Sequence, residues 1–203
     1  MLAAIQDFKK SDLKSTETKV HTVDGRVYSE KKDDSGRTVM TQLDTGQQGF
    51  VGDVREDLQV GEVLPGLIIG SQDVAHNAEL LEKHSVTYVL NAASFVENIF
   101  SDKLTYKNFN IYDRPETDIT VYFDEAHKFI ETGRQSGCVL VHCNAGVSRA
   151  ATLVISYLMK FNKMNFREAY DYLKEKRPVI RPNDGFVQQL KQYEIHRKEN
   201  TNN

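Results

Sequence analysis

The 203-residue sequence has few cysteines, little net charge and no long apolar runs. The chain has only two cysteines and no Asn-x-Ser/Thr glycosylation site, which indicates a reducing intracellular compartment. We expect the protein in the cytoplasm and also in the nucleus. The net charge of −3 gives no overall electrostatic reason to expect nucleic acid or an anionic membrane as a partner. No apolar run approaches the roughly 20 residues of a membrane-spanning helix, and residues 1–8 do not resemble a secretory signal.

The sequence also lacks the motifs of common metal and cofactor sites. Its six histidines include no His-Glu-x-x-His pair. There is no Cys-x-x-Cys motif and no Gly-x4-Gly-Lys-Ser/Thr phosphate-binding motif. We therefore expect a protein that works without a metal or a cofactor.

The first segment, residues 1–57, differs in composition from the rest of the chain. Polar and charged residues dominate it, and its apolar residues are isolated. We therefore expect a polar, flexible, partly ordered N-terminal arm, although Asp24-Gly25 would also permit a hairpin. Residues 58–196 have the mixture of apolar and polar residues that is typical of a globular domain, and the chain length suggests a single one. Residues 197–203 are expected to form a disordered tail.

Strand-like and helix-like segments alternate through residues 58–196. Asp73 and the pair Asn165 and Glu168 match an N-cap and a capping box, and Gly133 is a helix stop signal. The alternation predicts an α/β layer sandwich with helices on both faces, and a ligand site at the carboxyl end of a central strand. The predicted strands are 59–64, 67–69, 86–90, 106–112 and the continuous apolar run 138–142, and the predicted helices are 73–83, 119–132, 150–159, one that starts at Asn165, and 184–196.

One run at the junction between the last strand and an apolar helix combines several features of a phosphate site. A turn there points successive backbone N–H groups into one concavity, and the helix start adds positive potential. Arg149 can bind two phosphate oxygens with its planar fork, and Gly146 relieves crowding near the ligand. The same surroundings favour a thiolate over a thiol at Cys143. The run is His142-Cys143-Asn144-Ala145-Gly146-Val147-Ser148-Arg149-Ala150, of which residues 144–149 are the predicted phosphate contacts.

Plainer interpretations of these residues exist. Cys143 could be an inert buried thiol, but that does not explain the nearby glycine and arginine. Ser148 could be an ordinary N-cap, a donor to the sulfur as it leaves in a second step, or both. Cys138 is expected in the core, because about 16 Å of strand separates it from Cys143, whereas a disulfide needs Cα atoms within about 7 Å.

The pattern Cys-x5-Arg-Ala, as spelled out here, resembles the signature loop of the cysteine-based dual-specificity protein phosphatases. The resemblance extends over about residues 58–193 and, in Asp57–Val60 and Leu67–Asp73, is greatest to small atypical members. It implies the cysteine-phosphatase fold, an α/β fold whose central, mainly parallel five-stranded sheet is flanked by helices on both faces. The other matching segments are Ser156–Met159, Glu168-Ala169, Arg177-Pro178, Pro182–Phe186 and Gln189-Leu190.

The resemblance also implies a general acid. In the family, this aspartate lies on a loop ahead of a helix that carries Tyr/Phe-Phe, and Tyr122-Phe123 fits that helix. Asp113 stands at the family's spacing before it. Asp118 is the competitor, but it is better placed to cap the helix near Ile119.

Three further residues are predicted to act around the loop. Asn183 matches an asparagine that braces the loop in relatives, and His142 could orient the loop by hydrogen bonding to the backbone. Arg177 could contact a second phosphate on a doubly phosphorylated peptide, together with Arg181. Both arginines could equally face solvent.

These expectations amount to a metal-independent protein phosphatase that acts on phosphotyrosine and phosphoserine/phosphothreonine through a phosphocysteine intermediate. At family level we expect it to act on phosphorylated proteins of a stress-activated MAP-kinase pathway. The uncharged interior of the loop, residues 144–148, weakens the case for a lipid or RNA phosphatase. A phosphoprotein-binding scaffold with incidental activity is the alternative function. The sequence specifies no oligomeric state.

Overall fold

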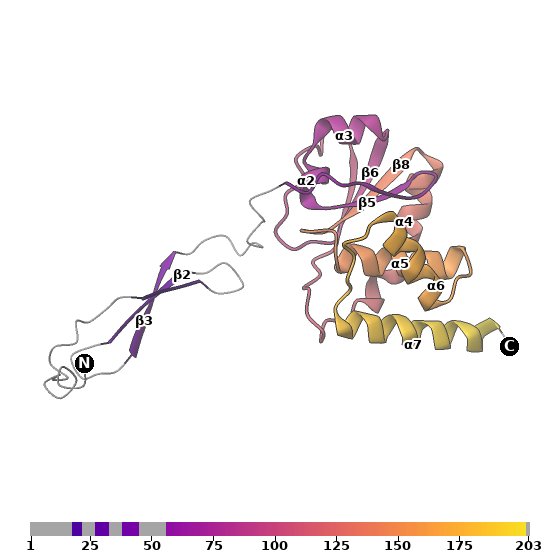
Figure 1. Ribbon diagram of the computed structural model, residues 1–203. Coiled ribbons are helices and arrows are strands. Elements are labelled where there is room, and N and C mark those ends of the chain that lie inside the picture. The colour runs from indigo at the N-terminus through magenta and orange to yellow at the C-terminus, as the bar shows by residue number, and fades with distance from the viewer. Residues whose placement is uncertain (1–17, 22–26, 33–37, 45–55, 202–203) are drawn as a thin grey trace, which may run out of the picture. The chain divides into compact units, whose positions relative to one another are not determined.

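The computed structural model describes residues 18–21, 27–32, 38–44 and 56–201 (Figure 1). The chain divides into two compact units, Met1–Val54 and Arg55–Asn203. Among the described helices, none is long and apolar enough to cross a membrane.

The first unit contains a three-stranded antiparallel sheet in the order β1-β2-β3. The strands are β1 (Thr18–His21), β2 (Val27–Lys32) and β3 (Thr38–Asp44). The sequence favoured a flexible arm here, with a hairpin around Asp24-Gly25 as the alternative. Strands β1 and β2 pair as that hairpin requires, and its proposed turn lies outside the described residues.

The second unit is built on a five-stranded sheet in the order β4-β5-β8-β6-β7. Strand β4 is antiparallel to β5, and all other pairs are parallel. The central strand β8 is buried along its whole length, which explains its continuous apolar sequence. The predicted mainly parallel sheet is confirmed. Its strands are β4 (Gly61–Leu64), β5 (Leu67–Gly70), β6 (Val86–Asn91), β7 (Thr105–Asn108) and β8 (Cys138–His142).

Helices cover both faces of this sheet (Figure 1). Helices α2 (Gln72–Ala75) and α3 (Ala78–Lys83) lie on one face. The other face carries α4 (Phe123–Gln135), which follows the 3₁₀ turn η2 (Thr120–Tyr122), together with α5 (Arg149–Phe161), α6 (Phe166–Lys176) and α7 (Asp184–Thr201). Strand alternation divides the core accordingly: Leu140 packs in the α2/α3 layer, and its neighbours Val139 and Val141 pack in the α5 layer.

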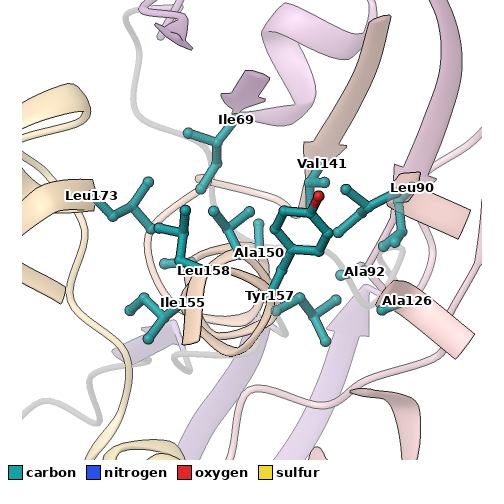
Figure 2. Packing of buried hydrophobic residues seen from close by; sticks show 14 of the residues in the cluster. Ile69, Leu90, Ala92, Ala126, Val141, Ala150, Ile155, Tyr157, Leu158 and Leu173 are labelled. Carbon is teal, nitrogen blue, oxygen red and sulfur yellow. The ribbon is translucent and has the colours of Figure 1, made fainter. Parts of the chain in front are cut away.

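Helix α5 is the centre of the larger core layer. Every residue from Arg149 to Met159 is buried. Figure 2 shows Ala150, Tyr157 and Leu158 of this helix among side chains from the sheet, such as Leu90 and Val141. Because α5 is enclosed on all sides, its first residue is held in a fixed position at the edge of the sheet.

Several predicted boundaries differ from the structure. The segment predicted as one helix, 73–83, forms two, because Ser71 caps α2 and Asn77 caps α3. Gly133 does not stop α4; it lies inside the helix, where a Cβ would meet Val139 at 2.9 Å. The capping box of Asn165 and Glu168 is confirmed.

Two further ends were misplaced. Strand β7 ends at Asn108 rather than continuing to residue 112. Helix α7 runs to Thr201, so residues 197–201, which we expected in a disordered tail, are helical. Arg, Lys and Glu in this stretch are good helix formers, and the helix can therefore continue without burying an apolar face.

Candidate active site

The loop between β8 and α5, residues 143–148, lies at the carboxyl end of the central strand, where open α/β sheets bind ligands. Cys143 is its first residue and is buried. Cys138 stands at the opposite end of β8 and belongs to the core, as predicted. Burial, assisted by the charge of Glu62, raises the pKa of the Cys138 thiol to about 11. The two thiols therefore lie at opposite ends of β8: Cys138 is in the hydrophobic core, and Cys143 is at the start of the loop.

The loop carbonyl oxygens are held from outside the loop. The backbone N–H of Gln72 donates to the oxygen of Asn144 at 2.8 Å, and that of Arg181 donates to the oxygen of Val147 at 2.8 Å. The Arg177 guanidinium donates to the two carbonyl oxygens in between. Since a trans peptide carries its N–H opposite its C=O, these contacts turn the N–H groups of residues 145–148 to the other side of the loop. A cluster of such N–H groups is an anion-binding site.

Gly146 makes this loop conformation accessible. Its φ is +65°, in the left-handed region that other residues rarely adopt. A Cβ at this position would lie 2.3 Å from the carbonyl oxygen of Gly70. The glycine predicted on steric grounds is therefore required both by its backbone angle and by the approach of strand β5.

Arg149 is the first residue of α5, and its guanidinium is held in place by two hydrogen bonds. One goes to the carbonyl oxygen of Ile111 at 3.1 Å, and the other to the side-chain oxygen of Asn144 at 2.6 Å. Its Nε lies 3.7 Å from Oδ2 of Asp113, and within the described residues this buried atom has no hydrogen-bond partner. A buried donor without a partner is costly, and an anion bound at the loop would satisfy it.

Asp113 lies beside the loop, 30 residues ahead of Cys143 in the chain. Its Oδ1 accepts from the Ser148 hydroxyl at 2.7 Å and from the Asn183 side chain at 2.8 Å. The backbone N–H of Asn183 donates to the Ser148 oxygen at 3.1 Å. Ser148 occupies the N-cap position of α5, but its side chain makes no cap hydrogen bond. The hydroxyl is instead part of a three-residue network with Asp113 and Asn183.

Asp118, the competing acid, lies in a different setting. Its Oδ1 accepts from the backbone N–H of Thr120 at 3.0 Å and from the Thr120 hydroxyl at 2.6 Å. These contacts stay within its own turn, and the predicted helix cap by Asp118 is not formed, because Ile119 is the N-cap residue of η2 and Tyr122 that of α4. Asn183 combines its contacts to Asp113 and Ser148 with a cap of α7, since its side-chain oxygen accepts from the N–H of Phe186 at 3.0 Å.

His142 packs beneath the loop. Burial lowers its pKa to about 4, so the ring is neutral at physiological pH. Its Nδ1 lies 3.4 Å from the carbonyl oxygen of Cys143. This contact matches the predicted interaction with the loop backbone.

Arg177 is where the site differs from expectation. We predicted a contact to a second phosphate or to solvent, but the side chain is completely buried. Its hydrogen bonds go to Ala145, Gly146, Gln59 and Asp57. Such a side chain is not available at the rim of the pocket. Of the two candidate arginines, only Arg181 is exposed.

Sequence reasoning assigned no role to two residues that contact this arrangement. Gln72 holds Asn144 through its backbone and its side chain, the latter at 3.4 Å. Asp57 pairs with Arg177 at 2.5 Å. Both lie in segments that resemble the family, Asp57–Val60 and Leu67–Asp73. That resemblance is the feature of the sequence that could have pointed to a role for them. Within the described residues, no three His, Cys, Asp or Glu side chains are grouped to hold a metal ion.

Comparison with known proteins agrees with this arrangement. Residues 67–196 match the family model for the dual specificity phosphatase catalytic domain. Dual specificity protein phosphatase 19 of Mus musculus is 45% identical over 199 residues, covering 97% of this chain and 90% of that protein. The likeness that Asp57–Val60 and Leu67–Asp73 indicated, to small atypical members of the family, extends along nearly the whole chain.

Two further matches, each over about two thirds of this chain, are informative. MAP kinase phosphatase with leucine-rich repeats protein 3 of Dictyostelium discoideum is 46% identical over 136 residues, which are 66% of this chain and 16% of that protein. The crystal structure of the human tyrosine phosphatase-like serine/threonine/tyrosine-interacting protein superposes with a TM-score of 0.66 at 36% identity, over 68% of this chain and 97% of that one. The chain therefore belongs to the dual-specificity phosphatase family, and it is a cysteine-based, metal-independent protein phosphatase.

Proposed function

We propose that this chain removes phosphate from tyrosine and from serine or threonine of phosphoproteins through a phosphocysteine intermediate. One observation carries the proposal: Cys143 opens the loop, and directly after the loop the first residue of α5, Arg149, has a buried Nε–H that makes no hydrogen bond within the described residues. The loop N–H groups and this guanidinium suit the equatorial oxygens of a phosphoryl group. The thiol at the base of the loop then supplies the nucleophile.

In the first step, the Cys143 thiolate attacks phosphorus, and the bond from phosphorus to the substrate oxygen breaks. Asp113 delivers a proton to that departing oxygen, so that an alcohol or phenol leaves. The contacts of Asp113 to Ser148 and Asn183 support this role, because they keep the carboxyl group beside the loop.

In the second step, water attacks phosphorus, and the bond from phosphorus to sulfur breaks. Asp113 now takes a proton from the water. The Ser148 hydroxyl, at the end of the loop, turns its hydrogen bond from Asp113 to the thiolate as the thiolate leaves and so stabilises it. The products are inorganic phosphate and the original Cys143 thiolate.

The choice of phosphoproteins as substrates, and of a MAP-kinase pathway as their setting, is part of the proposal. The loop interior, residues 144–148, contains no lysine or arginine that would suit the extra phosphates of an inositide. A relative with 46% identity is named as a MAP kinase phosphatase, which favours that class of phosphoprotein. We propose action in the cytoplasm and the nucleus.

A phosphoprotein-binding scaffold is the second candidate. It is favoured by the structural neighbour whose name describes a phosphatase-like interacting protein. A scaffold would keep its cellular effect when catalysis is removed, whereas a phosphatase would lose it. Comparing the cellular effect of the wild type with that of Cys143→Ser separates the two.

The same substitution tests the chemistry in vitro. Cys143→Ser should abolish hydrolysis of p-nitrophenyl phosphate, because an alcohol at the base of the loop is a far weaker nucleophile than a thiolate. The fold should persist, since the two side chains differ by one atom; circular dichroism and thermal unfolding check this. Cys138→Ser, at the other end of β8, is the matched control and should keep activity. Hydrolysis that survives in Cys143→Ser contradicts the proposed nucleophile.

A further inference from the structure

Arg177 is the most completely buried charged side chain near the loop. Its Nε donates to the carbonyl oxygen of Gly146 at 3.0 Å, and its Nη2 donates to that of Ala145 at 2.8 Å. The same Nη2 lies 2.5 Å from Oδ2 of Asp57, and Nη1 lies 2.5 Å from the carbonyl oxygen of Gln59. All three guanidinium nitrogens are therefore used, and none faces solvent.

Burying a cation is costly even when it is paired, and apolar side chains of similar volume often stabilise a core equally well. Stability alone is therefore a weak reason for an arginine at position 177. The arrangement makes better sense as a constraint on geometry. A planar guanidinium with donors in fixed directions can hold two successive carbonyl oxygens at once, which a lysine ammonium cannot do in the same way.

The two carbonyl oxygens that Arg177 holds lie in the middle of the phosphate-binding loop. When the oxygens of Ala145 and Gly146 turn toward Arg177, the N–H groups of Gly146 and Val147 turn away from it. Those are the N–H groups that the loop presents to a phosphate. Gly146 also lets the guanidinium come close, since a Cβ there would lie 3.0 Å from Nη2.

A segment just ahead of β4 completes the enclosure of Arg177. Asp57 supplies the only carboxylate that pairs with Arg177 among the described residues. Its backbone is tied to the start of α2: the Ser71 hydroxyl donates to the Asp57 carbonyl oxygen at 2.6 Å, and the Asp57 N–H donates to Asp73 at 2.9 Å. Gln72, between those two residues, holds the neighbouring loop carbonyl of Asn144. Three consecutive loop carbonyls are thus fixed by one connected set of residues.

We propose that Arg177 is a positioning residue for catalysis, which fixes the phosphate-binding conformation of the loop, and that Asp57 acts through it. The proposal rests on the proposed function, because it concerns the loop that binds the substrate phosphate. Arg177 never touches the phosphate. Its effect is to set the direction of the N–H groups that do.

Oxyanion affinity tests this role, with tungstate as the probe in place of phosphate. Arg177→Lys keeps the positive charge but loses the fork. We expect its dissociation constant for tungstate, by calorimetry, and its inhibition constant against p-nitrophenyl phosphate to rise about tenfold or more, because two charge-assisted hydrogen bonds to the loop are disturbed. Measurements are made well below the melting temperature of the variant.

Arg134→Lys is the matched control. Arg134 is a partly buried arginine that also has several partners, including the carbonyl oxygen of Pro65 at 3.1 Å, but it lies at the opposite end of the sheet from the loop. It should lower the melting temperature and leave tungstate affinity unchanged. A purely structural Arg177 would behave in the same way, so unchanged tungstate affinity in folded Arg177→Lys overturns the proposal.

Asp57→Asn provides a second test that does not depend on the folding of Arg177→Lys. The Asp57 side chain is 38% exposed, and the substitution keeps its shape while removing the charge. We expect tungstate affinity to fall severalfold, and the effect to vanish in the double variant if Asp57 acts through Arg177. Full additivity of the two effects would overturn the proposed coupling.

The outcomes for the two proposals are distinct. If the wild type shows no hydrolysis that depends on Cys143, the proposed function fails whatever Arg177 does. If wild-type hydrolysis depends on Cys143 while Arg177→Lys and Asp57→Asn both bind tungstate as the wild type does, only the positioning role fails.

Discussion

At the residue scale, Asp113 and Asp118 show how similar side chains acquire different uses. Both are carboxylates between β7 and η2. Asp113 contacts Ser148 and Asn183 and lies 3.7 Å from Arg149, whereas Asp118 binds Thr120 within its own turn. Only Asp113 is linked to the phosphate-binding loop.

This difference leads to a kinetic prediction. Asp113→Asn should lower kcat by about 10²–10⁴, the usual contribution of a general acid. The loss should be larger for phenyl phosphate than for p-nitrophenyl phosphate, because the poorer leaving group depends more on protonation. Tungstate affinity should persist. Asp118→Asn is the matched control, since the side-chain oxygen of asparagine can accept the same two hydrogen bonds from Thr120. A larger loss in Asp118→Asn would reverse the assignment.

Arg177 shows where residue-level reasoning fails. Its sequence neighbours, Lys176 and Pro178, are exposed, and an Arg-Pro pair after a helix suggests a surface turn. The side chain nevertheless points inward to partners 31 to 120 residues away in the chain. No local pattern encodes such contacts.

At the element scale, helix α7 packs closely against the loop that carries Asp113, and the Gln189 side chain of α7 is hydrogen-bonded to Thr117 and Ile119 of that loop. A Cβ on Gly185 would lie 2.1 Å from the carbonyl oxygen of Pro115 and 2.5 Å from its Cα. The first turn of α7 therefore lies directly against the backbone two residues beyond Asp113. The glycine in Pro182–Phe186 is explained by this contact.

Gly185→Ala should therefore reduce activity. Helix propensity alone would favour alanine by about 1 kcal/mol, but the added methyl group must displace the Pro115 backbone and with it Asp113. We expect kcat for p-nitrophenyl phosphate to fall about tenfold or more, as displacements near 1 Å at a catalytic group can cause. Gln188→Ala, an exposed position on the same helix, is the control. Wild-type kcat in Gly185→Ala would show that the loop adapts without moving Asp113.

At the scale of the whole molecule, two buried histidines link stability to pH. Burial, with the charge of Lys160, lowers the pKa of His127 to about 3, and burial lowers that of His142 to about 4. In the unfolded chain both protonate near pH 6.5. Between these values the unfolded state binds more protons, so stability is complete above pH 6.5 and falls as the pH drops toward 4.

His127→Gln isolates one of these contributions. His127 lies away from the loop, where its Nε2 contacts the Ser156 hydroxyl at 2.9 Å. As the pH falls from 7.5 to 5, the contribution of each such histidine to the free energy of unfolding should decrease by about 2 kcal/mol. In urea titrations, the variant should lose about 2 kcal/mol less than the wild type over that interval. An equal loss in both proteins would mean that His127 is protonated in the folded state.

The sequence by itself determined the α/β alternation, the continuous apolar strand β8 and the loop from Cys143 to Arg149. These are local signals, carried by periodicity and by residues that are neighbours in the chain. Element ends were less well predicted, because Ser71, Asn77 and Gly133 act through caps and packing that several local patterns could satisfy.

Only the tertiary structure decided how the loop is supported. Asp57, Gln72 and Arg177 come from separate segments, which lie ahead of β4, at the start of α2 and at the end of α6, and only the folded chain brings them to the loop. Their roles depend on burial and on the direction of single donors. Those properties do not exist until the chain has folded.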